Sequence, residues 1–228
     1  MKTNIFFLTT AVAAMMFASC GSNASEAGTA DSALTATEGS ASYVVDSNST
    51  MGWGGSKIVG IGTHAGTIAI QEGSISVENG NITAGTFTAD MTKIVCTDSG
   101  LPAEYATKLI GHLADDDFFN VEKFPTAKFV ISEVKAEANG ENTHVISGNL
   151  TLRDSTKNIS FPAAVAITEN SITAKGKTTI NRLDWGVNYD KANMSISEKA
   201  ASKLKNGVVS KDITISFDIK ASKKYTRL

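Results

Sequence analysis

The sequence has little histidine, cysteine or proline, and no large excess of charge of either sign. Its 228 residues include three histidines, two cysteines and three prolines, and the formal net charge is −2. So few histidines and cysteines give little material for a metal site or a disulfide framework. A near-neutral chain also lacks the positive face that nucleic-acid-binding proteins turn towards phosphates. We therefore expect no metal site, no disulfide framework and no nucleic-acid partner.

The first 20 residues have the pattern of a bacterial export signal. Lys2 precedes an apolar run from Ile5 to Phe17, and no acidic residue appears before Glu26. The run is too short to cross a bilayer comfortably as a helix, which takes roughly 20 residues. It ends in "FASC", where small residues precede Cys20 as they do in a lipobox. We predict that residues 1–19 are a lipoprotein signal peptide and that Cys20 is lipidated; an ordinary signal peptide with a chance cysteine is the alternative.

Residues 20–41 are small, polar and without periodicity. A segment of this kind buries too little apolar surface to order itself, so we predict a flexible tether that begins at the lipidated Cys20. The remaining residues, 42–228, are enough for one domain. If Cys20 carries lipid, Cys96 has no partner within the chain. We expect its thiol to be buried, as free cysteines usually are.

Apolar and polar residues alternate with a period of two through most of the domain, which is typical of strands with one apolar and one wet face. Asn-Gly pairs at Asn79 and Asn139 mark turns between strands. The apolar phase shifts near Gly85, which indicates a bulge or sharp bend there. The alternation predicts these inward faces: Gly148, Leu150 and Leu152; Ile159, Phe161, Ala163, Val165 and Ile167; Ile172, Ala174, Gly176, Thr178 and Ile180; Ile213, Ile215, Phe217 and Ile219.

Two stretches have helical periodicity. Residues 101–113 place Tyr105, Leu109 and Leu113 on one face, and residues 196–207 form a weaker case. Many short strands with tight turns predict a closed antiparallel barrel or a sandwich. Small inward residues favour the barrel, because they leave room inside it. The predicted fold class is therefore mainly β, an antiparallel barrel with one or two short helices covering its mouth.

Six segments between Tyr43 and about Ser222 carry a family resemblance. They read "YVVDSNSTMGWGGSK", "GTHAG", "HLADDDFFNVEKFPTAKF", "SGNLTLRDSTKNISFPA", "INRLDWGVNY" and "SKDITISFDIKA". With these segments in this order, the chain resembles the YceI-like family of exported bacterial proteins. The resemblance implies an extended, eight-stranded, lipocalin-like antiparallel barrel. It also implies that the lumen holds a long isoprenoid chain, such as a polyprenyl or quinone-like lipid.

The stretch "HLADDDFFNVEKFP" would follow the helix at the mouth of such a barrel. We expect its three aspartates, residues 115–117, to face water and cap the next turn. Phe118 and Phe119 would turn inward beneath them, where the rings either line a cavity or only fill the core. Together with the family resemblance, the pattern predicts lipid contacts at Leu109, Leu113, Phe118, Phe119, Phe129, Ile131 and Phe161.

His64 in "GTHAG" is the strongest candidate for a catalytic residue. No second histidine stands at a metal-binding spacing, and the sequence has no nucleophile elbow or phosphate loop. We therefore predict a structural His64, and a protein that is not an enzyme and has no cofactor other than a bound lipid. Trp53 and Trp185 suit a barrel base or mouth, where the ring packs and the indole N–H finds a partner.

Two functions of different classes remain open. The first is non-enzymatic binding, storage or transport of an isoprenoid or similar amphiphilic lipid. The second is an interaction or scaffold module whose barrel is filled by its own side chains, since eight strands have room for either. The predicted location is the cell envelope, as a lipoprotein anchored through Cys20 and facing the periplasm or the cell surface. Association into a homodimer is left open.

Overall fold

The computed structural model describes residues 25–57, 62–188, 195–201 and 209–225. The predicted signal peptide, Cys20 and part of the second predicted helix lie outside these residues, while residues 196–201 are helical as expected. Within the described parts of the chain, no helix has the length and apolar character to cross a bilayer. The elements are β1 (Gly28–Thr29), β2 (Ala41–Val45), β3 (Thr50–Lys57), β4 (Thr63–Glu78), β5 (Asn81–Cys96), α1 (Ala103–Ala114), β6 (Thr126–Asn139), β7 (Asn142–Leu152), β8 (Ser155–Ile167), β9 (Ser171–Asn181), the 3₁₀ helix η1 (Arg182–Trp185) and β10 (Val209–Lys223).

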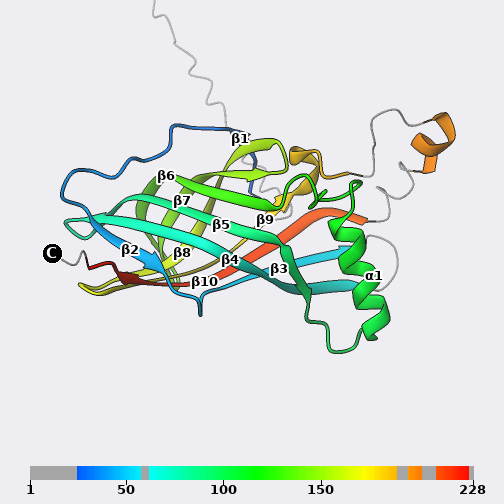
Figure 1. Cartoon of the computed structure of the whole chain (residues 1–228). Coiled ribbons are helices and arrows are strands. Elements are labelled where there is room, and N and C mark those ends of the chain that lie inside the picture. The colour runs from blue at the N-terminus through cyan, green and yellow to red at the C-terminus, as the bar shows by residue number, and fades with distance from the viewer. Residues whose placement is uncertain (1–24, 58–61, 189–194, 202–208, 226–228) are drawn as a thin grey trace, which may run out of the picture.

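The strands form an elongated antiparallel barrel (Figure 1). From β4 to β10 each strand pairs with the next along the chain. β2 and β3 both pair with β4 and with β10, so together they occupy one position and close the ring. Asn79 and Gly80 both have positive φ, as the tight hairpin between β4 and β5 requires. The predicted mainly-β, eight-stranded lipocalin-like barrel is confirmed.

The alternation of side chains follows the predicted inward faces. On β8, for example, Ile159, Phe161, Ala163 and Val165 are all buried. These residues belong to one hydrophobic cluster that draws side chains from all around the barrel. Burial of these side chains in a shared interior stabilises the barrel. The free energy gained is about 25 cal/mol per Å² of apolar surface removed from water.

The phase shift in β5 is a bulge, and it lies slightly before the predicted place. Ser76 pairs with Ala84 and Val77 with Ile82, which leaves Thr83 as the extra residue. Gly85 itself stays in register. A Cβ at Gly85 would lie 2.5 Å from Cδ1 of Ile131, so glycine is needed there for close packing rather than for the bend.

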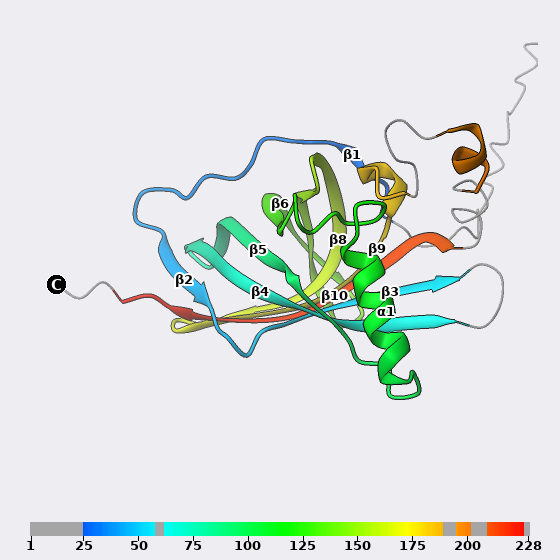
Figure 2. The same ribbon diagram turned by 45° about the vertical axis from the view of Figure 1, so that its right-hand side comes forward.

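Helix α1 lies at one end of the barrel, beside the ends of β3 and β4 (Figure 2). We call this end the mouth; η1 and the start of β10 lie there too, whereas the described chain ends at the opposite side (Figure 1). Glu104 and Lys108 form an exposed ion pair one turn apart on α1, with Nζ and Oε1 2.6 Å apart. Leu113 near the end of the helix is buried against the barrel.

The segment Ser25–Ser40, which we call the strap, runs along the outside of the barrel (Figures 1 and 2). It hydrogen-bonds to the barrel at several points, for example from the Ser25 N–H to the Thr179 carbonyl and from the Leu34 N–H to the Ile131 carbonyl. The prediction of a flexible tether over residues 20–41 is therefore wrong from Ser25 onwards. Composition failed there because backbone and side-chain hydrogen bonds, with only Ala27 and Leu34 packed against the apolar core, hold the strap in place.

Candidate ligand cavity

The barrel contains a cavity of about 590 Å³. Its wall is mostly apolar and is built from β3 to β10 together with α1, the turn after α1 and η1. This volume lies within the range of about 300–1,000 Å³ that is usual for small-molecule sites. The interior is therefore not filled by the protein's own side chains.

Four phenylalanines on different strands lie next to one another along the inner wall of the barrel. Phe87 on β5 and Phe129 on β6 have ring centroids 6.4 Å apart. Phe129 is 5.5 Å from Phe161 on β8, and Phe161 is 5.3 Å from Phe217 on β10. All four line the cavity, so a continuous aromatic surface extends over one part of its wall.

Glycines on the intervening strands make room for these rings. A Cβ at Gly148 on β7 would overlap the ring of Phe129, and a Cβ at Gly176 on β9 would overlap that of Phe217. A glycine inside a strand weakens it, so these positions mark a close approach that the packing requires. Phenylalanines on β6, β8 and β10 therefore alternate with glycines on β7 and β9, and this alternation allows the rings to form one aromatic surface.

Helix α1 and the turn after it cover the cavity at the mouth. Phe118 and Phe119 follow α1 and point inward, and Phe118 is 4% exposed. The Arg182 guanidinium lies 5.7 Å from the centre of the Phe118 ring. All the side chains predicted for lipid contact line the cavity: Leu109, Leu113, Phe118, Phe119, Phe129, Ile131 and Phe161. The structure thus brings together the whole predicted set, and it puts both rings at the cavity wall.

Polar side chains gather where the cavity meets the mouth. Lys57 at the end of β3, His64 at the start of β4 and Asp212 at the start of β10 all line it, with His112 of α1. Arg182 of η1 is buried and donates to backbone carbonyls, including that of Ser210 at 3.0 Å. The cavity therefore has a long apolar interior and a polar rim at one end.

His64 is paired with Asp98, which follows β5. Nδ1 of His64 lies 2.9 Å from Oδ2 of Asp98, and the N–H of Ala65 donates to Oδ1 at 3.1 Å. The hydrogen bond with His64 is the main cause that lowers the pKa of Asp98, opposed by desolvation and helped by the Ala65 N–H. This pair ties the start of β4 to the chain after β5, as a structural His64 would.

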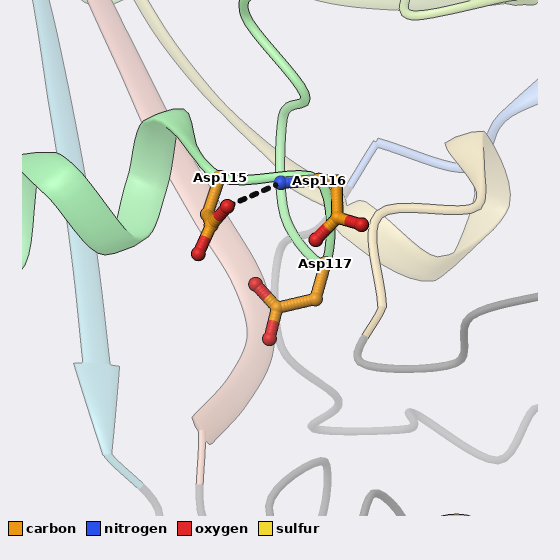
Figure 3. A group of neighbouring side chains, drawn as sticks. All are labelled: Asp115, Asp116 and Asp117. Atoms are coloured by element: carbon orange, nitrogen blue, oxygen red, sulfur yellow. Dashed lines mark hydrogen bonds between the residues drawn. The ribbon is translucent and has the colours of Figure 1, made fainter. Parts of the chain in front are cut away.

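The three aspartates after α1 lie close together, as Figure 3 shows. Oδ1 of Asp115 accepts from the N–H of Asp116 at 3.0 Å, and the Asp115 carbonyl accepts from the Phe118 N–H, so this residue begins the turn. Its side chain bonds the adjacent N–H rather than the second or third N–H that a capping side chain engages, so the predicted cap is not formed at Asp115. Asp115 and Asp116 are exposed. The prediction that all three face water is wrong for Asp117, whose side chain is 14% exposed and lies 3.9 Å from Nδ1 of His112.

The sequence predicted a hydrogen-bond partner for the indole N–H of each tryptophan and a buried thiol for Cys96. Trp53 donates to the Val95 carbonyl at 3.1 Å, and the fully buried Trp185 donates to the Leu150 carbonyl at 2.9 Å, which confirms that each indole N–H has a partner. Cys96 is a free cysteine, but it is only half-buried. The expectation of a buried thiol is wrong because β5 ends at the open rim rather than under the core.

Some cavity residues were missing from the predicted set. Phe217 belonged to a predicted inward face and could have been included on that ground. Phe87 follows from the phase of β5 once the bulge is placed before it. The polar rim had no such signal, since Lys57, His64 and Asp212 meet only because their strands end at the same side of the barrel.

Comparison with known protein families gives a match over most of the domain. The YceI-like domain family matches residues 43–221. The chain belongs to the YceI-like family. A UPF0312 protein of Pseudomonas paraeruginosa is 33% identical over 108 residues, which are 45% of this chain and 54% of that protein. A UPF0312 protein of Photorhabdus laumondii is 52% identical over 46 residues, 20% of this chain and 22% of that protein. The chain thus spans about half or less of the length of these relatives.

Two solved structures share the fold of this YceI-like domain. BcnA of Burkholderia cenocepacia superposes with a TM-score of 0.56 at 19% identity, over 77% of this chain and 98% of that one. A polyisoprenoid binding domain from Saccharophagus degradans, implicated in plant cell wall breakdown, gives a TM-score of 0.53 at 13% identity, over 80% and 98%. At such identities the likeness shows a common barrel.

Proposed function

We propose that this YceI-like protein binds a long apolar lipid, a polyisoprenoid or quinone-like amphiphile, inside its barrel without chemically altering it. The observation that carries the proposal is the apolar cavity of about 590 Å³ with polar side chains at one end. The fold that the chain shares with a polyisoprenoid binding domain of Saccharophagus degradans supports the same ligand class.

The wall suits an extended hydrocarbon chain. Burial of apolar ligand surface against the rings of Phe129, Phe161 and Phe217 would contribute about 25 cal/mol per Å². The polar rim would hold the head of the amphiphile, with the Lys57 ammonium as a hydrogen-bond donor and the second ring nitrogen of His64 beside the open end. A ligand with one apolar and one polar end fits this division of the cavity.

The protein would store or carry this lipid in the cell envelope. The apolar run from Ile5 to Phe17, followed by small residues and Cys20, supports a lipoprotein anchor. An anchored carrier would keep the barrel near the membrane that supplies its ligand. The scaffold alternative needs an interior filled by the protein's own side chains, and the open cavity weighs against it.

Mass spectrometry of organic extracts tests the proposal. The protein is purified from its native membranes, extracted, and compared with a variant whose cavity is narrowed, Ala174→Phe. We expect an isoprenoid or similar lipid at close to one per barrel in the wild-type protein and much less in the variant. Equal traces of mixed membrane lipid in both would contradict specific binding in the cavity.

A further inference from the structure

The barrel wall has an unpaired seam between β8 and β9. Their pairing runs from Ile167 opposite Ile172 to Ala163 opposite Gly176, and it stops there. Residues 155–162 of β8 and 177–181 of β9 continue towards the mouth without pairing to each other. Pro162 is the first residue beyond the paired part of β8, and it has no N–H to offer across the seam.

The first residues of the strap, 25–29, lie in this seam. The N–H of Ser25 donates to the Thr179 carbonyl of β9 at 2.7 Å, and its hydroxyl donates to the Ser160 carbonyl of β8 at 2.8 Å. Three residues later, β1 pairs with β8, with Gly28 opposite Asn158 and Thr29 opposite Lys157. The strap thus bonds to backbone groups of β8 and β9 that the two strands do not use to pair with each other.

Side chains on both sides of the seam line the cavity. Ile159 and Phe161 on β8, and Thr178 and Ile180 on β9, all line the cavity wall. The hydroxyl oxygens of Ser25 and Thr178 lie 2.7 Å apart, so the strap contacts a cavity-lining side chain through the gap. Of these four cavity-lining side chains only Thr178 is polar, in contrast to the polar rim of the mouth.

The strap is attached more weakly than the barrel strands are to one another. Its side chains are exposed apart from Ser25, Ala27, Leu34 and Ser40, and it contributes only the two-residue strand β1 to the sheet. Segments with few buried apolar contacts and exposed backbone hydrogen bonds open at lower free energy than the surrounding fold. The strap should therefore detach while the barrel stays folded.

We propose that the strap is a lateral gate and that lipid enters and leaves the cavity through the β8–β9 seam when the strap is released. This inference rests on the proposed function and adds the route by which the ligand is exchanged. An apolar chain passing sideways meets Ile159, Phe161 and Ile180, whereas a chain passing through the mouth must cross Lys57, His64 and Asp212. The strap also begins five residues after Cys20, a reach of at most ~18 Å, so an anchor at Cys20 holds the seam close to the membrane.

A reversible crosslink tests the gate. The full-length lipoprotein carries Ser25→Cys and Thr178→Cys, whose oxygens lie 2.7 Å apart in the wild type, on a Cys96→Ser background. A matched control carries Thr151→Cys and Thr156→Cys on the same background. Those side-chain oxygens are 2.9 Å apart on β7 and β8, which are already paired at this position, so a crosslink there does not fix the strap to the seam. Uptake and release of the apolar dye N-phenyl-1-naphthylamine are followed by stopped-flow fluorescence.

Oxidation of the Ser25/Thr178 pair is expected to slow both uptake and release roughly tenfold or more, about 1.4 kcal/mol in each barrier, and reduction is expected to restore them. The control pair is expected to change neither rate. Unchanged rates in the oxidised Ser25/Thr178 protein would overturn the gate and leave lipid binding intact, with exchange through the mouth. Failure of every variant and the wild type to bind the dye would overturn the proposed function and the gate together.

A second variant covers the case in which the crosslink does not form. Ser25→Ala removes the bonds to the Ser160 carbonyl and Thr178, so dye release is expected to accelerate about threefold to tenfold. Ser32→Ala, at an exposed strap position whose bond to Asp31 uses only its backbone N–H, is expected to leave release unchanged. Equal release from both variants would contradict the gate.

Discussion

The rings of Phe118 and Phe119 meet edge to face, with centroids 4.8 Å apart and planes inclined at 89°. Two neighbouring residues can share one cavity wall because they lie in a turn, where side chains do not alternate as they do in a strand. Asn120, directly after them, has a φ of 50° and helps the chain to reverse. The two rings differ in burial, since Phe118 is buried and Phe119 is only half-buried.

Truncation of the two rings should therefore give different results. Phe118→Ala is expected to cost about 3–5 kcal/mol of unfolding free energy, as for a buried core ring. Phe119→Ala is expected to cost less, about 1–2 kcal/mol, and mainly to weaken lipid or dye affinity. Urea unfolding and dye titration of both variants measure this. A loss of stability at Phe119 as large as that at Phe118, with dye affinity unchanged, would mean that Phe119 only fills the core.

A bulky residue on the cavity wall should block the ligand and spare the fold. Ala174 on β9 lines the cavity, whereas Ala163, although fully buried, is not among the lining residues. Ala174→Phe is expected to reduce dye binding tenfold or more at a stability cost of about 1–3 kcal/mol. Ala166→Phe, at an exposed position on β8, is the matched control and is expected to change neither. Undiminished binding in Ala174→Phe would place the ligand elsewhere.

Gly66 on β4 should tolerate no side chain. A Cβ there would overlap the backbone carbonyl of Val95 and would lie 2.6 Å from Nε1 of Trp53, which itself donates to that carbonyl. Gly66→Ala is expected to destabilise the protein by about 1–3 kcal/mol or more, because backbone has to move. Gly55→Ala, where nothing lies within 4 Å of the added carbon, is expected to be close to neutral. Thermal unfolding compares the two, and similar midpoints would contradict the packing at the rim.

The pair formed by Asp98 and His64 should make stability depend on pH in the acid range. The pKa of Asp98 is lowered in the folded protein, mainly by the hydrogen bond with His64. A lowered carboxyl pKa stabilises the folded state fully above the unfolded value near 4, and the gain is lost as pH falls through the folded pKa. The stability advantage of the wild type over Asp98→Asn should thus be constant from about pH 6 to 5 and shrink below about pH 4. An advantage that stays constant down to pH 2.5 would contradict this linkage.

Attachment of the protein to membranes should depend on Cys20. Cys20→Ala is expected to release it from membranes, because the proposed lipid anchor can no longer be attached. Detergent-phase partitioning of the two forms measures this, with Cys96→Ala as the control that should stay in the detergent phase. Partitioning of Cys20→Ala into the detergent phase would show that the lipobox resemblance is accidental.

The alternation of residues such as Ile159, Phe161 and Val165 was enough to predict the strands, their inward faces and most of the cavity wall. That pattern records burial directly, since one side of each strand leaves water. The path of the strap was not predictable in this way. Gly28 is held through backbone groups that any sequence carries, and Ser25 through its backbone N–H and a hydroxyl of a kind found throughout polar segments. The unpaired seam that receives them is a property of the whole barrel. The shift from Gly85 to Thr83 has a similar cause, because a bulge is fixed by the register of the partner strand rather than by the glycine.

The most direct test of lipid binding is an experimental structure of the protein purified from its native membrane without delipidation. We expect continuous, elongated density between Phe118 and Phe119 at one side and Phe129, Phe161 and Phe217 at the other, with its wider end at His64 and Lys57. A cavity that is closed by side chains, or one that contains only separate water peaks, would contradict lipid binding and would favour the scaffold role.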